Sequence, residues 1–217
     1  MRLVVPPLFR LLFRLRVEGK ENLPSSGPLI VASNHLSFID SYVIPISLLP
    51  LKVVFLAKAE YFETKGFKGW VSRWFFTSIG MIPVARGNGA SALSSLEQSA
   101  EIINGGAVFG IYPEGTRSMD GRLYRGKAGV GWVVLATGAP VLPVGLIGTQ
   151  DLQPYGSRFP KIGRRVTVRI GQPLEFGAYE GQPPARARRA ITDEVVQAIQ
   201  KLSEQEYTPE YNDHQSK

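Results

Sequence analysis

The sequence predicts one α/β domain built around a central, mostly parallel sheet flanked by helices. Three observations lead to this prediction. Short apolar runs alternate along the chain with segments of helical periodicity. The length of 217 residues suits a single domain of ordinary size. With 44% hydrophobic and 20% charged residues, the composition is that of a chain that buries a core.

The expected strands are apolar runs bounded by Gly, Pro or Asn, and they span residues 28–33, 52–57, 107–112, 140–147 and 166–170. The expected helices show amphipathic spacing or end at Gly, and they span residues 37–48, 90–103, 127–137 and 185–205. In an open sheet of this kind, ligands gather beyond the strand ends. Residues 18–206 are expected to form the domain, and residues 207–217 are expected to be a polar, disordered tail.

Residues 1–17, MRLVVPPLFRLLFRLRV, are expected to form an N-terminal amphipathic segment. The apolar run is too short for a spanning helix, which needs about 20 residues, and no signal-peptide cleavage site follows it. From Pro7 onward, leucines at helical spacing are interleaved with Arg10, Arg14 and Arg16. This pattern suits the headgroup boundary of a bilayer. The alternative is a helix that packs on the domain with its arginines in solvent.

The charge and the rare residue types limit the classes of function. With 25 Lys and Arg against 18 Asp and Glu, the net charge of +7 favours a polyanionic partner. Nucleic acid, anionic lipid and an acidic carrier protein all qualify, but the chain shows no nucleic-acid-binding motif. The absence of cysteine excludes disulfides, a Cys nucleophile and Cys-based metal sites. With two histidines and no clustered carboxylates, no metal site is expected.

The first candidate site is NHLSFID, residues 34–40, which directly follows an apolar strand. His35 and Asp40 are five residues apart, so they lie on different faces of a continuous helix. They can meet only if His35 lies in the loop before the helix and Asp40 in its first turns. The carboxylate then accepts the Nδ1 hydrogen, and Nε2 serves as a base. Two structural alternatives remain: Ser37 and Asp40 fit a capping box, and a lone loop histidine is commonly a surface residue.

The second candidate site is GMIPVARG, residues 80–87, an apolar strand leading to Arg86 in a glycine-containing loop. A guanidinium suits phosphate because it offers a planar fork of donors. An ordinary surface arginine is the alternative. APVLPV, residues 139–144, is expected to be structural at a strand start, and Arg125 and Lys127 add two cations before a helix.

The third candidate site is YPEGTRS, residues 112–118, directly after a strand. Pro113 and Gly115 force a tight turn. The turn directs backbone N–H groups and Arg117 outward from the strand end, which makes an anion site. Glu114 can order this loop by pairing with an arginine or by capping the backbone.

Together these segments resemble the glycerolipid acyltransferases, most closely the 1-acylglycerol-3-phosphate acyltransferases. The family's four blocks, NHxxxxD, GxIPVxR, (F/Y)PEGTRS and (V/A)P(I/V)xPV, correspond in order to NHLSFID, GMIPVAR, YPEGTRS and APVLPV. The resemblance covers about residues 17–170. The chain departs from the pattern at Met81, where isoleucine or a valine-like residue is common, and in lacking the long N-terminal hydrophobic helices of some members.

The resemblance implies that His35 removes the proton of an acceptor hydroxyl while Asp40 holds the imidazolium. The hydroxyl oxygen then attacks an acyl thioester directly, since neither a Cys nor a G-x-S-x-G serine is present to act as nucleophile. The resemblance assigns a catalytic role to His35 and Asp40 and a supporting role to Asn34, Pro113 and Lys127. It assigns binding of the acceptor phosphate to Arg86, Glu114, Gly115, Thr116 and Arg117.

The expected reaction is acylation of lysophosphatidate by acyl-CoA or acylated carrier protein, with no tightly bound cofactor. The expected location is the cytoplasmic face of the cell membrane, as a peripheral or monotopic protein on anionic phospholipid. A relative that acylates another lysophospholipid or a glycolipid is the main alternative. A hydrolase explains a His–Asp pair but not two phosphate-directed arginines, and a basic nucleic-acid-binding protein is the most distant alternative.

Overall fold

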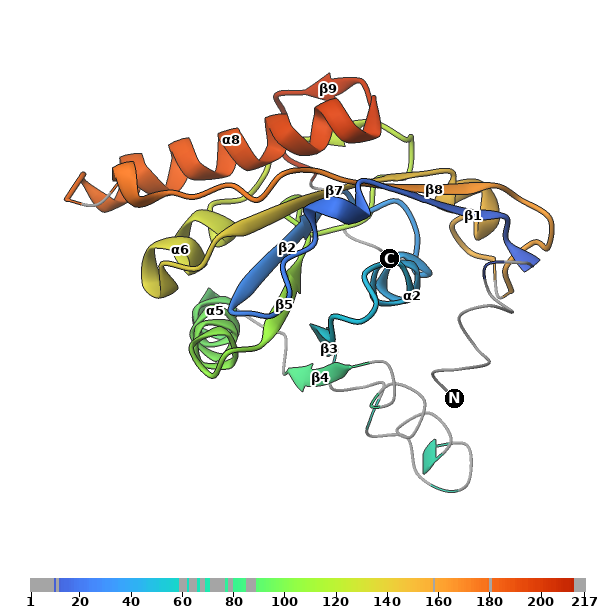
Figure 1. Ribbon diagram of the computed structural model, residues 1–217, viewed down its shortest axis with the longest axis horizontal. Helices are drawn as coiled ribbons and strands as arrows, with labels where there is room; N and C mark the ends of the chain where they lie inside the picture. Colours follow the sequence, from blue (N-terminus) through green and yellow to red (C-terminus); the bar gives the residue numbers. More distant parts are fainter. Residues whose placement is uncertain are drawn as a thin grey trace.

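The computed structural model describes residues 10, 12–58, 62, 66, 69–70, 77, 80–84, 89–157, 159–179 and 181–212. Its main sheet has seven strands in the order β1-β8-β7-β2-β5-β3-β4 (Figure 1). In chain order these strands are β1 (Leu15–Glu18), β2 (Leu29–Ser33), β3 (Val53–Lys58), β4 (Met81–Val84), β5 (Val108–Ile111), β7 (Val141–Ile147) and β8 (Val166–Ile170). A two-stranded sheet pairs β6 (Leu123–Tyr124) with β9 (Tyr207–Thr208).

The main sheet is mostly parallel, as the sequence predicts. Strand β2 lies at its centre, parallel to both β5 and β7. Strands β7 and β8 pair antiparallel, while every other neighbouring pair in this sheet is parallel. Parallel strands that are covered on both faces carry continuous apolar runs, and β2, LIVAS, is buried along its whole length.

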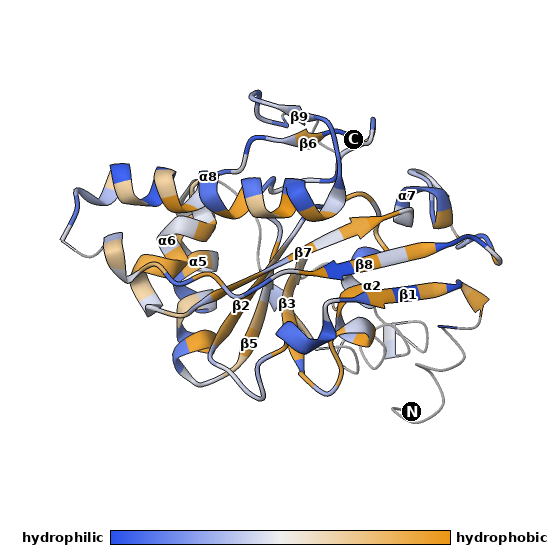
Figure 2. Cartoon of the chain, turned by 45° about the horizontal axis from the view of Figure 1, so that its top comes forward, coloured by the Kyte–Doolittle hydropathy of each residue, from blue (hydrophilic) through white to orange (hydrophobic). Residues whose placement is uncertain are grey.

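Helices cover both faces of the sheet (Figure 1). The helices are α2 (Asp40–Ser47), α5 (Gly89–Asn104), α6 (Gly129–Thr137), α7 (Thr149–Leu152) and α8 (Pro184–Ser203), with 3-10 turns at Lys20–Asn22 and Gly177–Tyr179. Alternate residues of β2 point to opposite faces. Leu29 and Val31 join a core with α2, whereas Ile30 and Ala32 join a core with α5, α6 and α8. Helix α8 shows hydrophilic and hydrophobic stripes along its length (Figure 2), which suits an amphipathic helix packed on the sheet.

The expectation of a helix from Pro7 to Val17 is wrong from Leu15 onward, because this part of the chain is strand β1. Leu15 lies opposite Val166 in a parallel pairing with β8. Leu15 and Val17 pack on the core, and Arg16 between them is exposed. The alternation of apolar and charged residues suits a strand, and the leucine spacing suits a helix equally well. Pairing with a distant strand therefore decides which of the two structures forms.

The expected disordered tail is wrong for residues 207–212, which pack on the domain. In the pairing of β6 with β9, Leu123 lies opposite Tyr207. The backbone N–H groups of Leu123 and Arg125 donate to the carbonyl oxygens of Glu206 and Glu210, each over 2.9 Å. The polar composition of this segment suggested a solvated chain, but its backbone is satisfied by a distant loop.

Candidate active site

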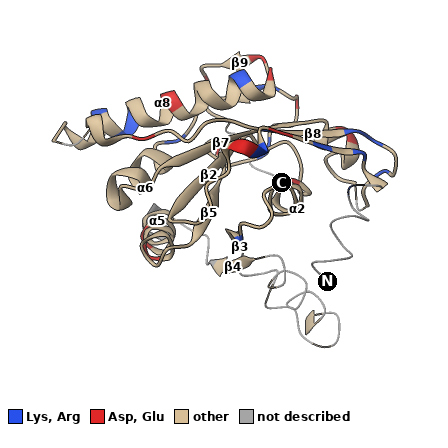
Figure 3. Cartoon of the chain, in the orientation of Figure 1, with Lys and Arg blue, Asp and Glu red and all other residues tan. Residues whose placement is uncertain are grey.

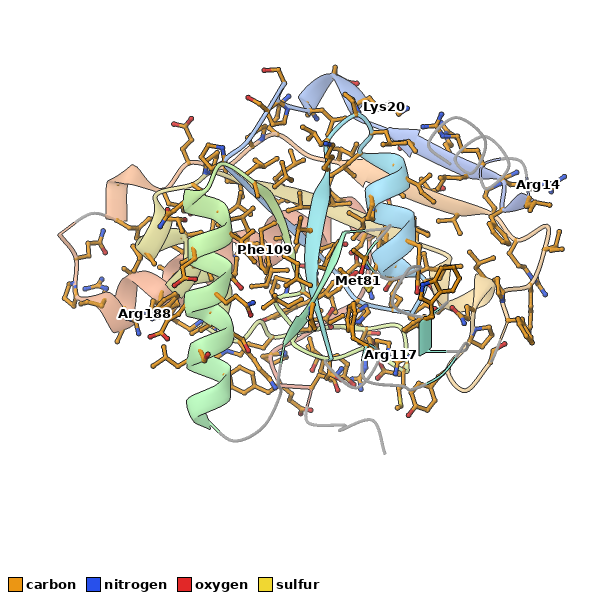
Figure 4. The ribbon with its side chains drawn as sticks, turned by 90° about the horizontal axis from the view of Figure 1, so that it is seen from below. Arg14, Lys20, Met81, Phe109, Arg117 and Arg188 are labelled. Atoms are coloured by element: carbon orange, nitrogen blue, oxygen red, sulfur yellow. The ribbon has the colours of Figure 1, made fainter. Side chains whose placement is uncertain are left out.

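The candidate site lies beyond the carboxyl ends of the central strands. His35 follows β2 and Tyr112 follows β5, and these two strands are direct neighbours. Figure 4 shows Phe109 within the sheet and Arg117 in the loop that lies past the end of β5. Because β2 and β5 run parallel, the NHLSFID and YPEGTRS segments emerge at the same edge.

His35 and Asp40 form the contact that the spacing predicts. His35 lies in the loop after β2, and Asp40 is the first residue of α2. The Nδ1 atom of His35 lies 2.9 Å from Oδ2 of Asp40. The Asp40 side chain is fully buried, while the His35 side chain is 17% exposed. The carboxylate oxygen accepts from Nδ1, so in the neutral form of the imidazole the hydrogen lies on Nδ1 and Nε2 is the free acceptor nitrogen.

Only one of the two hydrogen bonds of a capping box forms between Ser37 and Asp40. Its Oδ2 atom accepts the backbone N–H groups of Leu36 over 2.7 Å and Ser37 over 2.8 Å. The reciprocal bond of a capping box is replaced, since Ser37 Oγ donates to the carbonyl oxygen of Gln153 over 2.7 Å. Asp40 therefore orders the loop that carries His35 and contacts the imidazole with the same oxygen.

Tyr112 is a site residue that the sequence reasoning missed as a functional residue, although it begins the YPEGTRS segment. Its ring stacks on His35, with centroids 3.9 Å apart and planes at 8°. The Tyr112 hydroxyl shares a 2.9 Å hydrogen bond with Ser41 Oγ, and the Phe55 ring stacks on Tyr112 at 5.4 Å. Burial, reinforced by the charge of Asp40, holds the pKa of Tyr112 well above its usual value of 10.0. The phenol therefore stays neutral, and its ring packs against one face of the imidazole.

Glu114 is fully buried and links two segments of backbone. Its Oε1 atom accepts the His35 N–H over 3.0 Å, and Oε2 accepts the Tyr124 N–H over 3.1 Å. Burial raises the pKa of Glu114 to about 7, although both N–H donors act in the opposite direction. The sequence allowed either an arginine partner or a backbone cap, and the cap is what forms. Because the side chain is fully buried and both of its oxygens accept backbone N–H groups, this placement argues against the expected contact with a phosphate.

The loop after β5 is a tight turn tied to the His35 loop. Gly115 has a φ of +77° and donates its N–H to the Tyr112 carbonyl over 3.0 Å. This φ favours glycine. The N–H of Ser118 donates to the carbonyl oxygen of His35 over 2.7 Å. The residue before it, Arg117, is thereby held beside the histidine loop, and Thr116 is partly buried in the same turn.

The cations of this region have different environments. The Arg117 guanidinium carbon lies 5.1 Å from the ring centroid of Tyr155, which is a cation–π contact. Lys127 is exposed, and its side chain passes close to Gly115, while its backbone N–H donates to the Pro113 carbonyl over 2.8 Å. This hydrogen bond ties the turn after β5 to the backbone just before α6. Arg86 lies outside the described residues.

Asn34 is buried and extends the pairing of β2 with β7. Its side-chain Nδ2 donates to the Leu146 carbonyl over 2.9 Å, and Oδ1 accepts the Leu146 N–H over 2.8 Å. Nδ2 also donates to Gln205 Oε1 over 2.7 Å. These contacts hold the backbone just before His35, so Asn34 supports the site through position rather than chemistry.

The C-terminal segment forms a strap over the site loops, which the sequence did not indicate. Gln205 contacts Asn34 and also donates to the Gly121 carbonyl over 2.7 Å. Asn212 is 2% exposed and donates to the Arg117 carbonyl over 3.1 Å. The histidine loop is therefore fastened to a residue 171 positions further along the chain, and the arginine loop to one 95 positions further along.

The described residues were expected to hold neither a metal site nor a membrane-spanning helix. Within the described residues, no cluster of three or more His, Cys, Asp or Glu side chains is placed to hold a metal ion. The expectation of a reaction without a tightly bound cofactor stays a prediction. In the same part of the chain, no helix combines the length and apolar character needed to cross a bilayer.

The profile of the family described as Acyltransferase matches residues 14–147. A chloroplastic 1-acyl-sn-glycerol-3-phosphate acyltransferase of Arabidopsis thaliana is 34% identical over 75% of this chain and 44% of its own length. One from Brassica napus is 36% identical over 84% of this chain and 51% of its own length. One from Bacillus subtilis is 29% identical, over 87% of both chains. The chain thus spans about half the length of the two plant relatives.

A solved structure of an acyltransferase is also similar to this chain. The crystal structure of a 1-acyl-sn-glycerophosphate acyltransferase from Thermotoga maritima superimposes with a TM-score of 0.65 at 26% identity, and the match covers 87% of this chain and 71% of that one. The α/β fold, the profile match over residues 14–147 and the plant relatives above 30% identity agree. This chain belongs to the acyltransferase family.

Proposed function

We propose that this chain is a 1-acyl-sn-glycerol-3-phosphate O-acyltransferase, which transfers a fatty acyl group from a thioester to the free hydroxyl of lysophosphatidate and yields phosphatidate. The observation that carries the proposal is the pairing of His35 with a fully buried Asp40 beside the loop of Arg117. A base and a phosphate-binding cation at one sheet edge suit an acceptor that carries both a hydroxyl and a phosphate.

In the proposed reaction, Nε2 of His35 takes the proton of the acceptor hydroxyl, and the hydroxyl oxygen forms a bond to the thioester carbonyl carbon. Asp40 stabilises the imidazolium through Nδ1, at the 2.9 Å contact. The tetrahedral intermediate then collapses, the carbon–sulfur bond breaks, and the thiolate takes the proton from His35. Backbone N–H groups or a cation near His35 meet the oxyanion.

Arg117 is the proposed ligand of the acceptor phosphate among the described residues, with Arg86 as its partner. The guanidinium of Arg117 is held against Tyr155, and its backbone is fastened by Asn212. Gly115 and Thr116 shape the turn, and the exposed ammonium of Lys127 adds positive charge close to Gly115. A preformed cationic turn lowers the entropy lost when the phosphate binds.

The proposed acyl donor is acyl-CoA or acylated carrier protein, and neither serves as a bound cofactor. The proposed location is the cytoplasmic face of the cell membrane, where the acceptor lipid lies. Residues 1–17 and the aromatic stretch 67–76 are candidate contacts with anionic phospholipid. The alternative for the aromatic stretch is packing in the core or along the acyl chain, and most of that stretch lies outside the described residues.

The test is transfer from labelled acyl-CoA or acylated carrier protein to a panel of lysolipids, with products separated by chromatography. Lysophosphatidate is the expected acceptor, and His35→Ala is the matched inactive control. Faster acylation of another lysophospholipid or a glycolipid would replace the proposed acceptor and keep the chemistry. Absence of transfer to every lipid, with a protein that melts cooperatively, would reject the function.

A further inference from the structure

We infer that residues 153–165, the loop between α7 and β8, form a second membrane-contacting surface that docks the site on an anionic bilayer. The inference deepens the proposed function, since it assumes that the acceptor is a membrane lipid. It differs from the expectation that residues 1–17 and 67–76 make this contact. Four properties of the loop support it: its exposed apolar side chains, its charge, the hydrogen bonds of its described residues and its position.

The loop carries two exposed apolar side chains, Phe159 and Ile162. Each is 73% exposed, which makes them the most exposed large hydrophobic side chains of the described residues. A single exposed apolar residue is ordinary in a soluble protein. Two at the tip of one loop, separated by Pro160 and Lys161, form a small apolar projection instead. Such a projection becomes favourable when it enters the boundary between headgroups and acyl chains.

The charge of the loop matches an anionic surface. Lys161, Arg164 and Arg165 are exposed, and residues 152–165 contain no Asp or Glu. Within the part of the chain that the structure describes, none of these three cations enters an ion pair. Figure 3 shows Lys and Arg along the loop next to β8, at the end of the molecule near β1. Cations around an apolar tip suit acidic headgroups around acyl chains.

The described residues of the loop, 153–157 and 159–165, make several backbone hydrogen bonds. Ser157 donates its N–H to the Pro154 carbonyl over 2.9 Å and its hydroxyl to the Phe159 carbonyl over 2.8 Å. The Lys161 N–H donates to the Leu152 carbonyl over 2.7 Å. Because these bonds already fix the backbone, little conformational entropy is lost when the tip inserts.

The position of the loop connects it with both the site and the N-terminal segment. At its beginning, the carbonyl of Gln153 accepts the Ser37 hydroxyl, and the Tyr155 ring lies under the Arg117 guanidinium. At its end, the Gly163 N–H donates to the Leu12 carbonyl over 3.0 Å. A bilayer that contacts this loop therefore lies beside the histidine loop, where a lipid acceptor can reach His35 without leaving the membrane entirely.

Vesicle co-sedimentation of the full chain tests the inference without any substrate. The double substitution Phe159→Ser with Ile162→Ser is compared with Leu93→Ser with Leu135→Ser, which removes exposed apolar residues from α5 and α6. We expect the loop variant to lose about tenfold or more in partition onto phosphatidylglycerol-containing vesicles, since each side chain leaves an apolar environment. The control variant should bind like the unaltered chain.

A second pair of variants tests the charge. Replacing Lys161, Arg164 and Arg165 with Gln should lower binding to anionic vesicles by about fivefold for each cation. The control replaces Lys52, Arg186 and Lys201, which are exposed elsewhere. The loss should vanish on phosphatidylcholine vesicles and shrink as salt rises.

Unchanged vesicle binding by both loop variants would overturn the inference, as would equal losses in the loop and control variants. So would a loop variant that binds vesicles normally but loses only the reaction with acylated carrier protein, because the loop would then dock the carrier. Activity on detergent-dispersed substrate is measured separately. If the unaltered chain has no such activity but its vesicle binding depends on the loop, the proposed function fails while the membrane surface stands.

Discussion

The ring of Tyr112 lies flat on the imidazole of His35, with centroids 3.9 Å apart and planes at 8°. Tyr112 is itself fixed by the Ser41 hydroxyl and by the Phe55 ring. Gly110 makes room for that ring, because a Cβ at position 110 would lie 2.3 Å from it. The imidazole is therefore confined between a carboxylate at Nδ1 and an aromatic face.

Replacing Tyr112 tests whether the stack orients His35. Tyr112→Phe keeps the ring and loses only the bond to Ser41, so turnover should change by no more than a few-fold. Tyr112→Leu removes the stack, which is worth about 0.5–1.5 kcal/mol in aromatic pairs. We expect a fall in kcat of up to about tenfold with little change in KM. Equal activity in the Leu and Phe variants would show that the stack does not position the base.

His35→Ala should lower acyl transfer by about 10² to 10⁴-fold, because the hydroxyl loses its general base. Folding should persist, since the His35 side chain is partly exposed and its backbone contacts remain. Rates are measured with saturating donor, and a thermal melt accompanies them. Activity within a few-fold of the unaltered chain would exclude His35 as the base.

Asp40→Asn should lower both turnover and stability. Oδ2 of Asp40 accepts from Nδ1 of His35 and from two backbone N–H groups, and a neutral amide lacks the negative charge that strengthens these three contacts. Loss of the cap-like contacts costs about 1 kcal/mol, which a urea titration detects. A loss of turnover that persists under conditions where the variant is fully folded measures the catalytic contribution of Asp40. If turnover follows only the folded fraction, Asp40 is structural.

Arg117→Ala should raise KM for the phosphorylated acceptor by about ten- to a hundredfold, since a charge-assisted contact is worth about 1.5–3 kcal/mol. KM for the acyl donor should change little. Arg125→Ala is a matched control, because Arg125 makes the same kind of contact with Tyr211, also at 5.1 Å. Equal effects of the two substitutions on the acceptor, or equal effects of Arg117→Ala on both substrates, would contradict the phosphate role.

Glu114→Gln should alter how stability depends on pH. In the unfolded chain this carboxyl titrates near its ordinary value of 4.5, whereas burial raises its pKa to about 7 in the folded protein. Between pH 4.5 and 7 the folded state retains the proton longer, so the free energy of unfolding falls as pH rises in this window. The variant has no carboxyl group at this position, so its free energy of unfolding lacks this dependence on pH. Urea titrations should show the unaltered chain losing about 3 kcal/mol relative to the variant across that range. Parallel curves would refute the raised pKa.

Much of the fold, and the contact between His35 and Asp40, could be predicted from the sequence alone. The apolar runs predicted β2, β3, β5, β7 and β8, and helical spacing or end signals predicted α2, α5, α6 and α8. These signals are local, because a chain buried on one stripe or on both faces must repeat apolar residues at a fixed period. The five-residue spacing of His35 and Asp40 likewise fixed how they could meet, since loop and helix geometry are set by neighbours in sequence.

Contacts between distant segments were decided only by the tertiary structure. Strand β1 was expected to continue a helix, and it became a strand because the edge of β8 was available to pair with it. Residues 207–212 were expected to be disordered, yet they form a strap because the loop of Arg117 offers backbone partners. Glu114 turned away from solvent toward the backbone of His35 for the same reason. The sequence determines which residues can form the site. The packing of the chain decides which of them stay exposed at the sheet edge and which hold others in place, because long-range hydrogen bonds depend on what the fold brings near.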